Sequence, residues 1–527
     1  MTTDIRFRVF ANLYKDSVAL MQVGAALRKR PGVIEASCVM ATPANLAQLQ
    51  HADLSVDADV HPSDLLIVVR GEAQACGDAI DAAQALLQGS PAGTAESGAT
   101  FSLPLTSIAA GVEQSPDADL ALISVPGDYA AAEALKALSL GLHVMLFSDN
   151  VGIEQELAIK RHAGERGLLV MGPDCGTAII NGIPLGFANV VRRGNIGIVA
   201  ASGTGLQEVT CRIHNDGGGV SQAIGTGGRD LRDEIGGLTM LAALRALAAD
   251  DTTRVIVLIS KPPSPAVASR ILSLAASSGK PAVVHFLGAA PGSVQAAGLH
   301  AAQSLAEAAD IAVSLAQGSG RTGSTAAPNV SRVDHERVLD GLAPMQRIVR
   351  GLFTGGTFCY EAQLAFLRRG LPCRSNAPVH GAFPLDVDGS TGDHVFIDMG
   401  DDEYTRGRPH PMIDPSLRNR AIRDAAGDPA IAILLFDLVL GYGSHPSPAD
   451  ELADALRDAQ RSAALQGRKL VSIGHVCGTD GDPQDRAAQI RTLASAGAIV
   501  ADSNIEAAST AAELALQLAQ RHPAQTQ

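Results

Sequence analysis

The sequence contains no tryptophan, and only 3% of its 527 residues are aromatic, so its cores have to be built from aliphatic side chains. Its seven cysteines are scattered and never spaced as Cys-x-x-Cys, which argues against a disulfide framework or a zinc ribbon. No apolar run reaches the roughly 18 residues of a membrane helix. The polar N-terminus lacks the apolar core of a signal peptide. We therefore expect a cytoplasmic protein.

Basic charge is also scarce, because 41 Lys and Arg residues stand against 55 Asp and Glu residues, for a formal net charge of −14. This argues against a nucleic-acid partner held on a basic face and against an anionic membrane surface. The sequence has no P-loop, no Gly-x-Ser-x-Gly elbow and no metal-ligand spacing, so no metal is expected. We expect the C-terminal histidines on the surface or in loops: His380, His394, His410, His445 and His475.

Short runs rich in Val, Ile and Leu alternate with Ala- and Leu-rich stretches along the chain. The clearest runs are 120–125, 143–147, 167–171, 195–200, 255–260 and 282–287. Continuously apolar strands separated by helices predict parallel sheets covered on both faces, and therefore an α/β fold. The longest apolar run, 430–440, contains Asp437 and is predicted to be a buried strand. The length predicts three or four domains.

Two stretches rich in Gly, Ser, Ala and Pro, 87–105 and 317–333, have the composition of linkers. The regions that begin at 194 and 346 share five parts in the same order, starting with a strand, a small-residue turn and a helix. We interpret this weak internal repeat as two flavodoxin-like units that could pack as a pseudo-dimer.

Each copy of the repeat has a Gly-containing turn before its first helix, Ser-Gly-Thr-Gly at 202–205 and Thr-Gly-Gly-Thr at 354–357. Free backbone N–H groups and the helix dipole let such a turn bind phosphate or carboxylate. A Gly turn without any ligand is the alternative. Two turns at equivalent places of a repeat could direct both helices at one anion, and we predict that they open onto one cavity.

A charged loop at 401–414 is a further candidate, because it follows a strand end, where α/β folds place their ligands. Asp401 and Asp402 precede Arg406 and Arg408 in it. Arginine forks suit carboxylate and phosphate groups. A solvated charged loop is the alternative interpretation.

The stretch 168–230 resembles the succinyl-CoA synthetase α chain and, more closely, the FdrA family. The segments that carry the resemblance are TPAN at 42–45, SDN at 148–150, GPDCGT at 172–177, ASGTG at 201–205, GTGGRD at 225–230, SKPP at 260–263 and GRPHPMIDP at 407–415. The resemblance covers nearly the whole chain. It implies a chain like the synthetase α subunit, fused to a domain like the carboxy-terminal ligase domain of the β subunit.

The resemblance also implies a division into domains and roles for residues. The implied division is an N-terminal α/β domain at 1–90, a CoA-binding-like Rossmann domain at 100–192, ligase-like domains at 194–318 and 343–522, and a linker at 319–342. Ser202, Gly203 and Thr204 match the start of the α-chain helix directed at the phosphate. Gly355, Gly356 and Thr357 match its β-chain counterpart. The segment 172–175 matches the connection into the first ligase domain.

Departures from the synthetases limit what the resemblance implies. The loop with the phosphorylated histidine is missing between 280 and 303, and Lys261 stands where the family has the glutamate that steadies this histidine. The Gly-rich turn that holds CoA phosphates is absent from the N-terminal third, and there is no ATP-grasp domain. We therefore expect no phosphohistidine, and the resemblance assigns no cofactor to the chain. CoA binding is not expected.

Proteins similar to this one are linked with ureide (allantoin) breakdown, as subunits of an oxamate carbamoyltransferase with two partner subunits. The resemblance thus implies transfer between carbamoyl phosphate and oxamate, with oxalurate and phosphate as products, or the reverse. Lys261, Arg229 and Arg408 could supply positive charge, and Gly227, Gly228, Asp401 and Asp402 could line the substrate site. Two alternatives stay open, an ADP-forming acyl-CoA ligase and a non-catalytic scaffold for the partner subunits.

Overall fold

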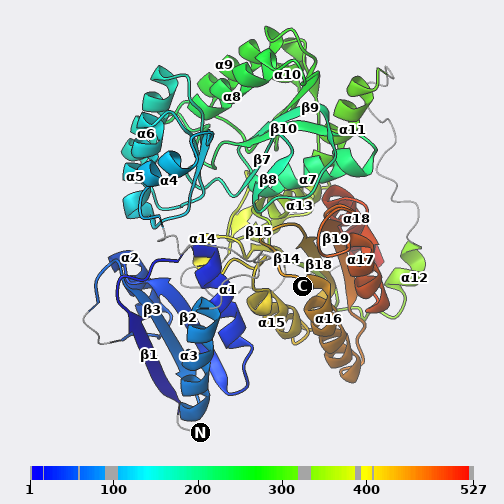
Figure 1. Ribbon diagram of the computed structural model, residues 1–527. Coiled ribbons are helices and arrows are strands. Elements are labelled where there is room, and N and C mark those ends of the chain that lie inside the picture. Colours follow the sequence, from blue (N-terminus) through cyan, green and yellow to red (C-terminus); the bar gives the residue numbers. More distant parts are fainter. Residues whose placement is uncertain are drawn as a thin grey trace. The chain divides into compact units, whose positions relative to one another are not determined.

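The computed structural model describes residues 3–15, 17–56, 60–88, 105–318, 334–385, 393–405 and 409–521. The chain divides into a first unit, Met1–Asp174 with Asp402–Asp414, and a second unit, Cys175–Asp401 with Pro415–Gln527 (Figure 1). Most of both predicted linkers, and the candidates Arg406 and Arg408, lie outside the described residues. Within the described part of the chain, no helix combines the length and apolar character needed to cross a membrane.

The first unit begins with a three-stranded sheet and three helices. In chain order they are β1 (Asp4–Phe10), α1 (Ser17–Arg28), β2 (Val33–Met40), α2 (Pro43–His51), β3 (Leu65–Gly71) and α3 (Ala73–Gln88). In the order β1-β3-β2 the central strand is β3, and all of its pairings are antiparallel. The expectation of parallel sheets is therefore wrong here. A central strand covered on both faces is continuously apolar in either type of sheet, so the pattern could not distinguish them.

The remainder of the first unit contains a small parallel sheet. Its elements are α4 (Ile108–Gln114), β4 (Leu120–Ile123), α5 (Gly127–Ser139), β5 (His143–Leu146), α6 (Ile153–Glu165) and β6 (Val170–Met171), with the strand order β4-β5-β6. Helix α14 (Asp402–Thr405) also belongs to this unit. Arg28 of α1 holds Asp414 through an ion pair of 2.7 Å. The loop 401–414, predicted as one candidate site, is thus divided, because Asp401 belongs to the second unit and Asp402 to the first.

The second unit contains two seven-stranded sheets, which we call the first half and the second half. The first half is built from β7 (Thr177–Ile180), β8 (Ile183–Gly186), β9 (Arg193–Ala200), α7 (Gly203–Asn215), β10 (Val220–Gly225), α8 (Leu238–Ala249), β11 (Val255–Ser260), α9 (Pro265–Ala276), β12 (Ala282–Phe286), α10 (Gly292–Ala296), β13 (His300–Ala301) and α11 (Leu305–Ala316). Its strand order is β13-β12-β11-β9-β10-β7-β8. Strands β7 and β8 pair antiparallel and extend this sheet, although the sequence analysis placed them in the preceding domain.

The second half repeats this architecture with a different edge. Its elements are α12 (His335–Leu339), β14 (Ile348–Phe353), α13 (Gly356–Leu367), β15 (Cys373–Ser375), β16 (Phe383–Pro384), β17 (His394–Asp398), α15 (Ser416–Ala425), β18 (Ile431–Val439), α16 (Pro448–Leu465), β19 (Val471–Cys477), α17 (Arg486–Ser495), β20 (Ile499–Ala501) and α18 (Asn504–Arg521). Among the described residues, all strand pairs of this sheet are parallel. Helix α12 lies within the predicted linker 319–342. The proposed domain boundaries otherwise remain predictions.

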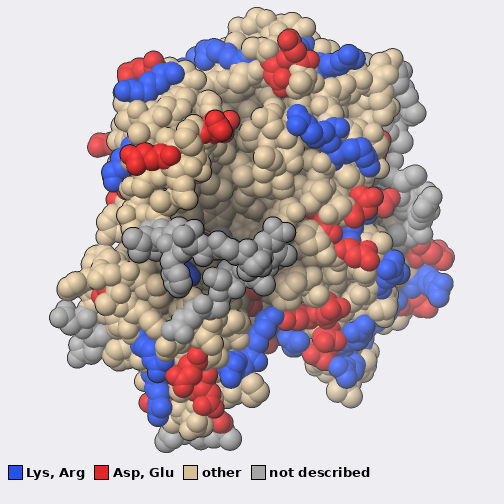
Figure 2. Space-filling view, in the orientation of Figure 1, with Lys and Arg blue, Asp and Glu red and all other residues tan. Residues whose placement is uncertain are grey.

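The parallel strands determine where a site can form. Their carboxyl ends meet at one edge of each sheet. The turns after β9 and β11 lie at that edge of the first half, and the turns after β14 and β17 lie at that edge of the second half. In Figure 1 the green helix α7 of the first half lies next to α13 of the second half. On the face shown in Figure 2, described Lys and Arg residues lie among Asp and Glu residues and do not gather in one basic area. This fits the acidic composition.

Candidate functional site

The two Gly-containing turns of the repeat contact each other in the second unit. The hydroxyl of Ser202, before α7, is hydrogen-bonded to the hydroxyl of Thr357, in the first turn of α13. A Cβ added at Gly355 would lie 2.9 Å from the Cγ2 of Thr204. The prediction that the halves pack with these turns face to face is therefore confirmed. The single cavity onto which they were predicted to open stays a prediction.

Helix α7 supplies its own N-cap. The side chain of Ser202 accepts a hydrogen bond from the backbone N–H of Gly205 at 3.0 Å, and so occupies one of the amides that a helix start leaves unpaired. The amides of Gly203 and Thr204 donate to no acceptor among the described residues. These two N–H groups, together with the helix dipole, are available to an anion.

Helix α13 has glycine at the corresponding position and obtains its acceptor from the neighbouring strand β18. The carboxylate of Asp437 accepts the N–H of Thr354 at 2.7 Å, the N–H of Gly355 at 2.8 Å and the Thr354 hydroxyl at 3.0 Å. Asp437 is fully buried, and Arg418 of α15 lies 3.7 Å from it. Burial raises the pKa of Asp437, whereas Arg418 and the three donors stabilise its charged form.

This carboxylate modifies the site that the sequence predicts at 354–357. The amide of Gly355 already has an acceptor within the protein, so it is not available to phosphate. Within the described part of the chain, the amides of Gly356 and Thr357 have no acceptor. An anion bound between the two helices would therefore use two amides from each helix.

A lysine and a second carboxylate lie near the start of α13. Lys261 follows β11, and its Nζ is 5.7 Å from the ring centre of Tyr360 on α13. Asp398 is the last residue of β17 and is 7% exposed, and a Cβ added at Gly356 would overlap its Oδ2. Burial raises the pKa of Asp398 to about 6, although the charge of Lys261 opposes this shift. Lys261 thus lies beside α13, and its role toward a substrate stays a prediction.

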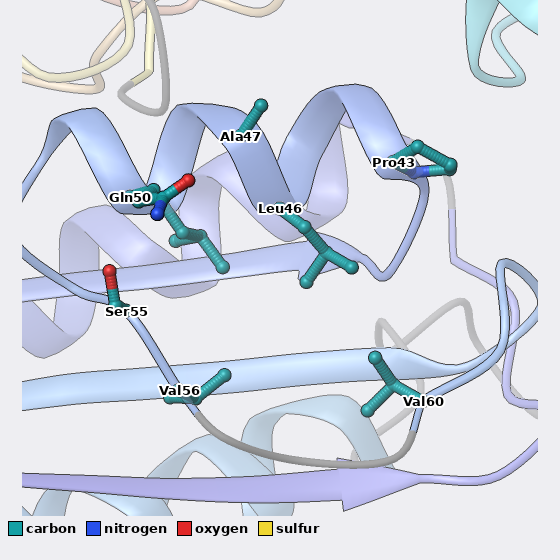
Figure 3. Close-up of a pocket in the computed structure, with 8 residues that line it drawn as sticks. Pro43, Leu46, Ala47, Gln50, Ser55, Val56 and Val60 are labelled. Atoms are coloured by element: carbon teal, nitrogen blue, oxygen red, sulfur yellow. The ribbon is translucent and has the colours of Figure 1, made fainter.

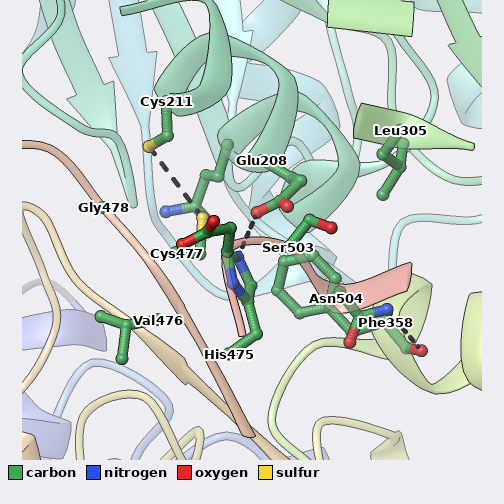
Figure 4. Close-up of polar contacts among 12 residues, drawn as sticks. Glu208, Cys211, Leu305, Phe358, His475, Val476, Cys477, Gly478, Ser503 and Asn504 are labelled. Atoms are coloured by element: carbon green, nitrogen blue, oxygen red, sulfur yellow. Dashed lines mark hydrogen bonds and ion pairs between the residues drawn. The ribbon is translucent and has the colours of Figure 1, made fainter. Parts of the chain in front are cut away.

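Beneath the turns, a buried ion pair joins the two halves (Figure 4). Nε2 of His475, on β19, lies 2.7 Å from Oε2 of Glu208, on α7. Burial alone would raise the pKa of Glu208 and lower that of His475, but the pair shifts both in the opposite directions. The ring of Phe358 meets His475 edge-on, and the sulfurs of Cys211 and Cys477 are 4.0 Å apart. This cluster fixes α7 against the second half.

A second buried carboxylate, Glu361 on α13, bridges helices of both halves. Its Oε1 accepts the N–H of Leu305 at the start of α11 at 3.1 Å, and its Oε2 accepts from the side chain of Asn504 at the start of α18 at 2.8 Å. Burial raises the pKa of Glu361 to about 7. Glu361 therefore ties α13 to the starts of α11 and α18.

The remaining predicted residues are less closely connected. Gly227, Gly228 and Arg229 follow β10, the strand next to β9, and Arg229 is half-buried with a partner of its own. The neighbouring Asp230 accepts backbone N–H groups at the start of α8 at 2.9 and 3.1 Å, which explains the turn structurally. Whether this turn contacts a substrate stays a prediction, as does the role of Asp401.

Sequence analysis missed the carboxylates Asp398 and Asp437. A single charged residue inside the apolar run 430–440 was the available signal for Asp437, because a buried carboxylate requires donors. The prediction that His475 lies on the surface or in a loop is wrong, since it lies in the interior of β19. His394 likewise belongs to a strand, β17. Burial of a histidine depends on partners that are distant in the sequence.

The N-terminal domain has a pocket of its own, with a volume of about 440 Å³ (Figure 3). It lies between α2 and the following loop and is lined by Pro43, Leu46, Ala47, Leu49, Gln50, Ser55, Val56 and Val60. The TPAN segment at 42–45 forms the start of α2, where Thr42 accepts the N–H of Asn45 at 3.3 Å. This contact accounts for the segment as a helix cap.

Three family models match the chain. The model for the AllF heavy metal-associated domain matches residues 1–101, the CoA binding domain matches 191–288, and the CoA-ligase model matches 352–514. The last two matches fall on the first and second halves of the second unit. They agree with the α/β architecture and with the resemblance to the synthetases.

Among curated proteins, the uncharacterized protein YahF of Escherichia coli is 42% identical over 95% of this chain and 96% of its own length. The ADP-forming sulfoacetate-CoA ligase subunit SauD of Bilophila wadsworthia is 28% identical over 29% of this chain, and a succinate–CoA ligase α subunit of Archaeoglobus fulgidus is 30% identical over 28%. The chain covers 54% and 50% of these two ligase subunits. The acetyl-coenzyme A synthetase of Ca. Korarchaeum cryptofilum aligns at 15% identity over 77% of this chain and 83% of its own, with a TM-score of 0.32.

The metal implied by the name of the first model does not fit the residues present. Cys38 and Cys76 are the only cysteines of the matched region, and both are buried in its hydrophobic core. Burial raises the pKa of Cys38 to about 12 and also raises that of Cys76, which disfavours the thiolate that a soft metal binds. The described residues contain no group of three His, Cys, Asp or Glu side chains able to hold a metal ion.

The small parallel sheet of the first unit, where the resemblance implies a CoA-binding-like domain, lies outside the match to the CoA binding model. The turn after β4 leads into α5 with Asp128 in its first turn, where a phosphate group would be repelled. Gly127 in this turn is needed for packing, because an added Cβ would overlap backbone atoms of 149–150. The amides at Gly203 and Thr204 suit phosphate groups in general and do not select CoA.

Proposed function

This chain belongs to the family of YahF, and we propose that it is the phosphate-holding subunit of a carbamoyltransferase. The reaction is the transfer of a carbamoyl group between carbamoyl phosphate and oxamate, with oxalurate and phosphate on the other side. Ureide breakdown is the pathway in which the chain would act. The AllF-type domain at its N-terminus supports this assignment, as do the ligase-like halves without a phosphohistidine loop.

The observation that carries the proposal is the contact between the two helix starts. Ser202 and Thr357 bring α7 and α13 together, and each helix keeps two amides without an acceptor in the described chain. Each helix start contributes partial positive charge, which stabilises an anion by about 0.3–1 kcal/mol and by up to about 2 kcal/mol in partly buried geometry. Lys261 adds a full charge from the first half.

These elements suit carbamoyl transfer because the reaction needs stabilisation of a leaving phosphate. The acceptor nitrogen attacks the carbamoyl carbon, and negative charge accumulates on the phosphate oxygens as the C–O bond breaks. Fixed amides and Lys261 would stabilise that charge more strongly in the transition state than in the ground state. No covalent intermediate on the protein is required.

The test uses the complex isolated through an affinity tag on the full-length chain, assayed for oxalurate phosphorolysis. Gly203→Val is the decisive variant, because an added Cβ makes only an ordinary 3.5 Å contact with Thr177 while a larger side chain blocks the amides. Gly292→Val is the matched control, at the first residue of α10 with nothing near its Cβ. We expect the first variant alone to lose activity and phosphate binding.

Circular dichroism shows whether each variant is folded, so a loss of activity through misfolding can be recognised. A folded Gly203→Val protein with full activity would show that phosphate does not bind at this turn. Incubation with labelled ATP, CoA and succinate tests the ligase alternative. We expect no acid-labile phosphate on the chain, and a stoichiometric phosphohistidine would restore the ligase function in its place.

A further inference from the structure

Asp398 occupies an unusual place for an acidic residue, beside the start of a helix proposed to bind an anion. Its Oδ1 accepts the N–H of Gly400 at 3.0 Å. Its Oδ2 lies against Gly356 of α13 and accepts no hydrogen bond from any described residue. With 7% of its surface exposed, this carboxylate has one satisfied oxygen and one that faces the helix start.

The groups around Asp398 come from every neighbouring element. Lys261 after β11 favours its charged form, while Asp401 in the following turn and Asp437 on β18 oppose it. On α13 the nearby titratable group is the buried thiol of Cys359, whose pKa is raised by burial. Burial contributes most to the pKa of Asp398, which lies at about 6. A dianion arriving at the helix start would raise it further, because like charges disfavour ionisation.

We infer that Asp398 carries the proton between the acceptor nitrogen and the phosphate oxygen during carbamoyl transfer. The inference rests on the proposed function. In the synthetic direction the oxamate nitrogen forms a bond to the carbamoyl carbon, and Asp398, protonated beside the bound dianion, donates its proton to the phosphate oxygen as the C–O bond breaks with its electron pair on that oxygen. The Asp398 carboxylate then accepts the proton that the nitrogen loses, which restores its starting state. The products are oxalurate and hydrogen phosphate, and phosphorolysis is the same path reversed.

The other ionisable groups near the turns are unsuited to this step. Asp437 accepts three hydrogen bonds and is paired with Arg418, so both of its oxygens are committed. His475 lies deep beneath the turns and is paired with Glu208. Lys261 cannot accept a proton while charged. Asp398 is the carboxylate next to Gly356 whose second oxygen is uncommitted in the described chain.

The first experiment measures binding of sulfate to the full chain by calorimetry between pH 5 and 7. Sulfate is used because its own charge does not change in this range, unlike that of phosphate. If sulfate binds only when Asp398 is protonated, a pKa of about 6 makes the affinity fall about tenfold from pH 5 to pH 7. Asp398→Asn should bind sulfate with nearly constant affinity over this range.

The matched control is Asp393→Asn, the same substitution just before the other end of β17. Asp393 is paired with Arg374 at 2.6 Å, far along the strand from Asp398. We expect it to keep the tenfold dependence of the wild-type chain. Sulfate binding that is independent of pH in the wild type would overturn the role of Asp398, whatever the catalytic function of the chain.

The second experiment measures carbamoyl transfer by the tagged complex. Loss of a proton carrier typically reduces a rate by about 10²–10⁴, so Asp398→Asn should reduce kcat by this factor and leave phosphate binding at neutral pH equal or tighter. Asp398→Glu should restore part of the rate. A merely structural role would instead weaken phosphate binding and resist rescue.

The outcomes separate the inference from the function on which it rests. If the wild-type complex shows no carbamoyl transfer, the proposed function fails. If it is active and Asp398→Asn is equally active, the function stands and the inference about Asp398 is wrong.

Discussion

The two halves of the second unit begin their first helices at the same place in the repeat but satisfy those helix starts differently. The first half uses the hydroxyl of Ser202, one residue before α7. The second half has Gly355 there and uses the carboxylate of Asp437 from the neighbouring strand β18, with Arg418 behind it. A repeat can thus keep its backbone while the acceptor changes from a local neutral group to a distant charged one.

The same comparison applies to the layer beneath the turns. Glu208 and Glu361 each lie five residues after the first glycine of their helix, and His285 and His475 lie on corresponding strands. Of the two corresponding Glu–His pairs, Glu208 with His475 and Glu361 with His285, only the first forms. The Nε2 of His285 has no partner among the described residues. The symmetry of the backbone is therefore broken by the charges, and each half should respond differently to the same substitution.

The largest effect is expected when the start of α13 loses its charged acceptor, Asp437. Asp437→Asn leaves the fully buried Arg418 without its counter-charge, which should destabilise the second unit by about 3–5 kcal/mol. Urea unfolding followed by circular dichroism measures this, since the chain has no tryptophan for fluorescence. Ser202→Ala should cost much less.

A double variant sharpens this result. Replacing both partners, as in Asp437→Leu with Arg418→Met, removes the buried charges together and should recover a large part of the lost stability. If the double variant were less stable than Asp437→Asn, the hydrogen bonds of Asp437 to the turn, and not the charge of Arg418, would dominate.

The second prediction concerns the first glycine of each helix. A Cβ at Gly356 would overlap Oδ2 of Asp398, whereas a Cβ at Gly203 would meet only Thr177 at 3.5 Å. Gly356→Ala should therefore destabilise the chain by about 1–3 kcal/mol, as overpacking does. Gly203→Ala should be close to neutral. Equal effects in the two halves, measured by the same unfolding assay, would contradict the asymmetry.

Much of the fold follows from local sequence patterns, because strands and helix starts depend on near neighbours. The run 255–260 is strand β11 as predicted, and both Gly-containing turns open helices. The antiparallel order β1-β3-β2 was missed because a central strand covered on both faces has the same apolar pattern in either type of sheet. Strand order is a property of pairing, which the local pattern does not contain.

The candidate site shows the same limit. Ser202 and Thr357 could be predicted from the repeat, because equivalent turns of a pseudo-dimer can meet. The partner of His475 could not, since Glu208 lies 267 residues away in the sequence. Asp398 was passed over for the more conspicuous pair Asp401 and Asp402, although strand β17 ends at Asp398. The last residue of a parallel strand is the position to examine in such patterns.

The third prediction uses pH to distinguish the two histidines. Burial lowers the pKa of His285 to about 4, so the unfolded chain binds its proton first and stability is lost as pH falls below about 6.5. Between pH 7 and 5 this loss is about 2 kcal/mol. His285→Asn should abolish that part of the acid sensitivity.

The pKa of His475 is raised by Glu208, so its effect on stability changes with pH in the opposite direction to that of His285. Its contribution is fully present below the unfolded pKa near 6.5 and is lost as pH rises through the higher folded value. Replacing both partners, Glu208→Gln with His475→Asn, removes this contribution without leaving Glu208 buried and unpaired, and should make the chain more sensitive to acid between pH 7 and 5. Urea unfolding at several pH values tests both variants, and shifts of the same sign would contradict the charge assignment.

The smallest effect is expected at the neutral helix start. Ser202→Ala removes the acceptor for the N–H of Gly205 and should cost about 1 kcal/mol, the usual value for an N-cap. Ser202→Gly should cost only a few tenths of a kcal/mol, because glycine leaves the amide open to water. The reverse exchange is blocked, since a Cβ at Gly355 would lie 2.8 Å from the ring of Phe358 and 3.1 Å from Asp437. Gly355→Ser should therefore destabilise the chain, although serine is a good capping residue. Thermal unfolding of these three variants decides the point, and a stabilised Gly355→Ser protein would mean that the second half can accept a local cap after all.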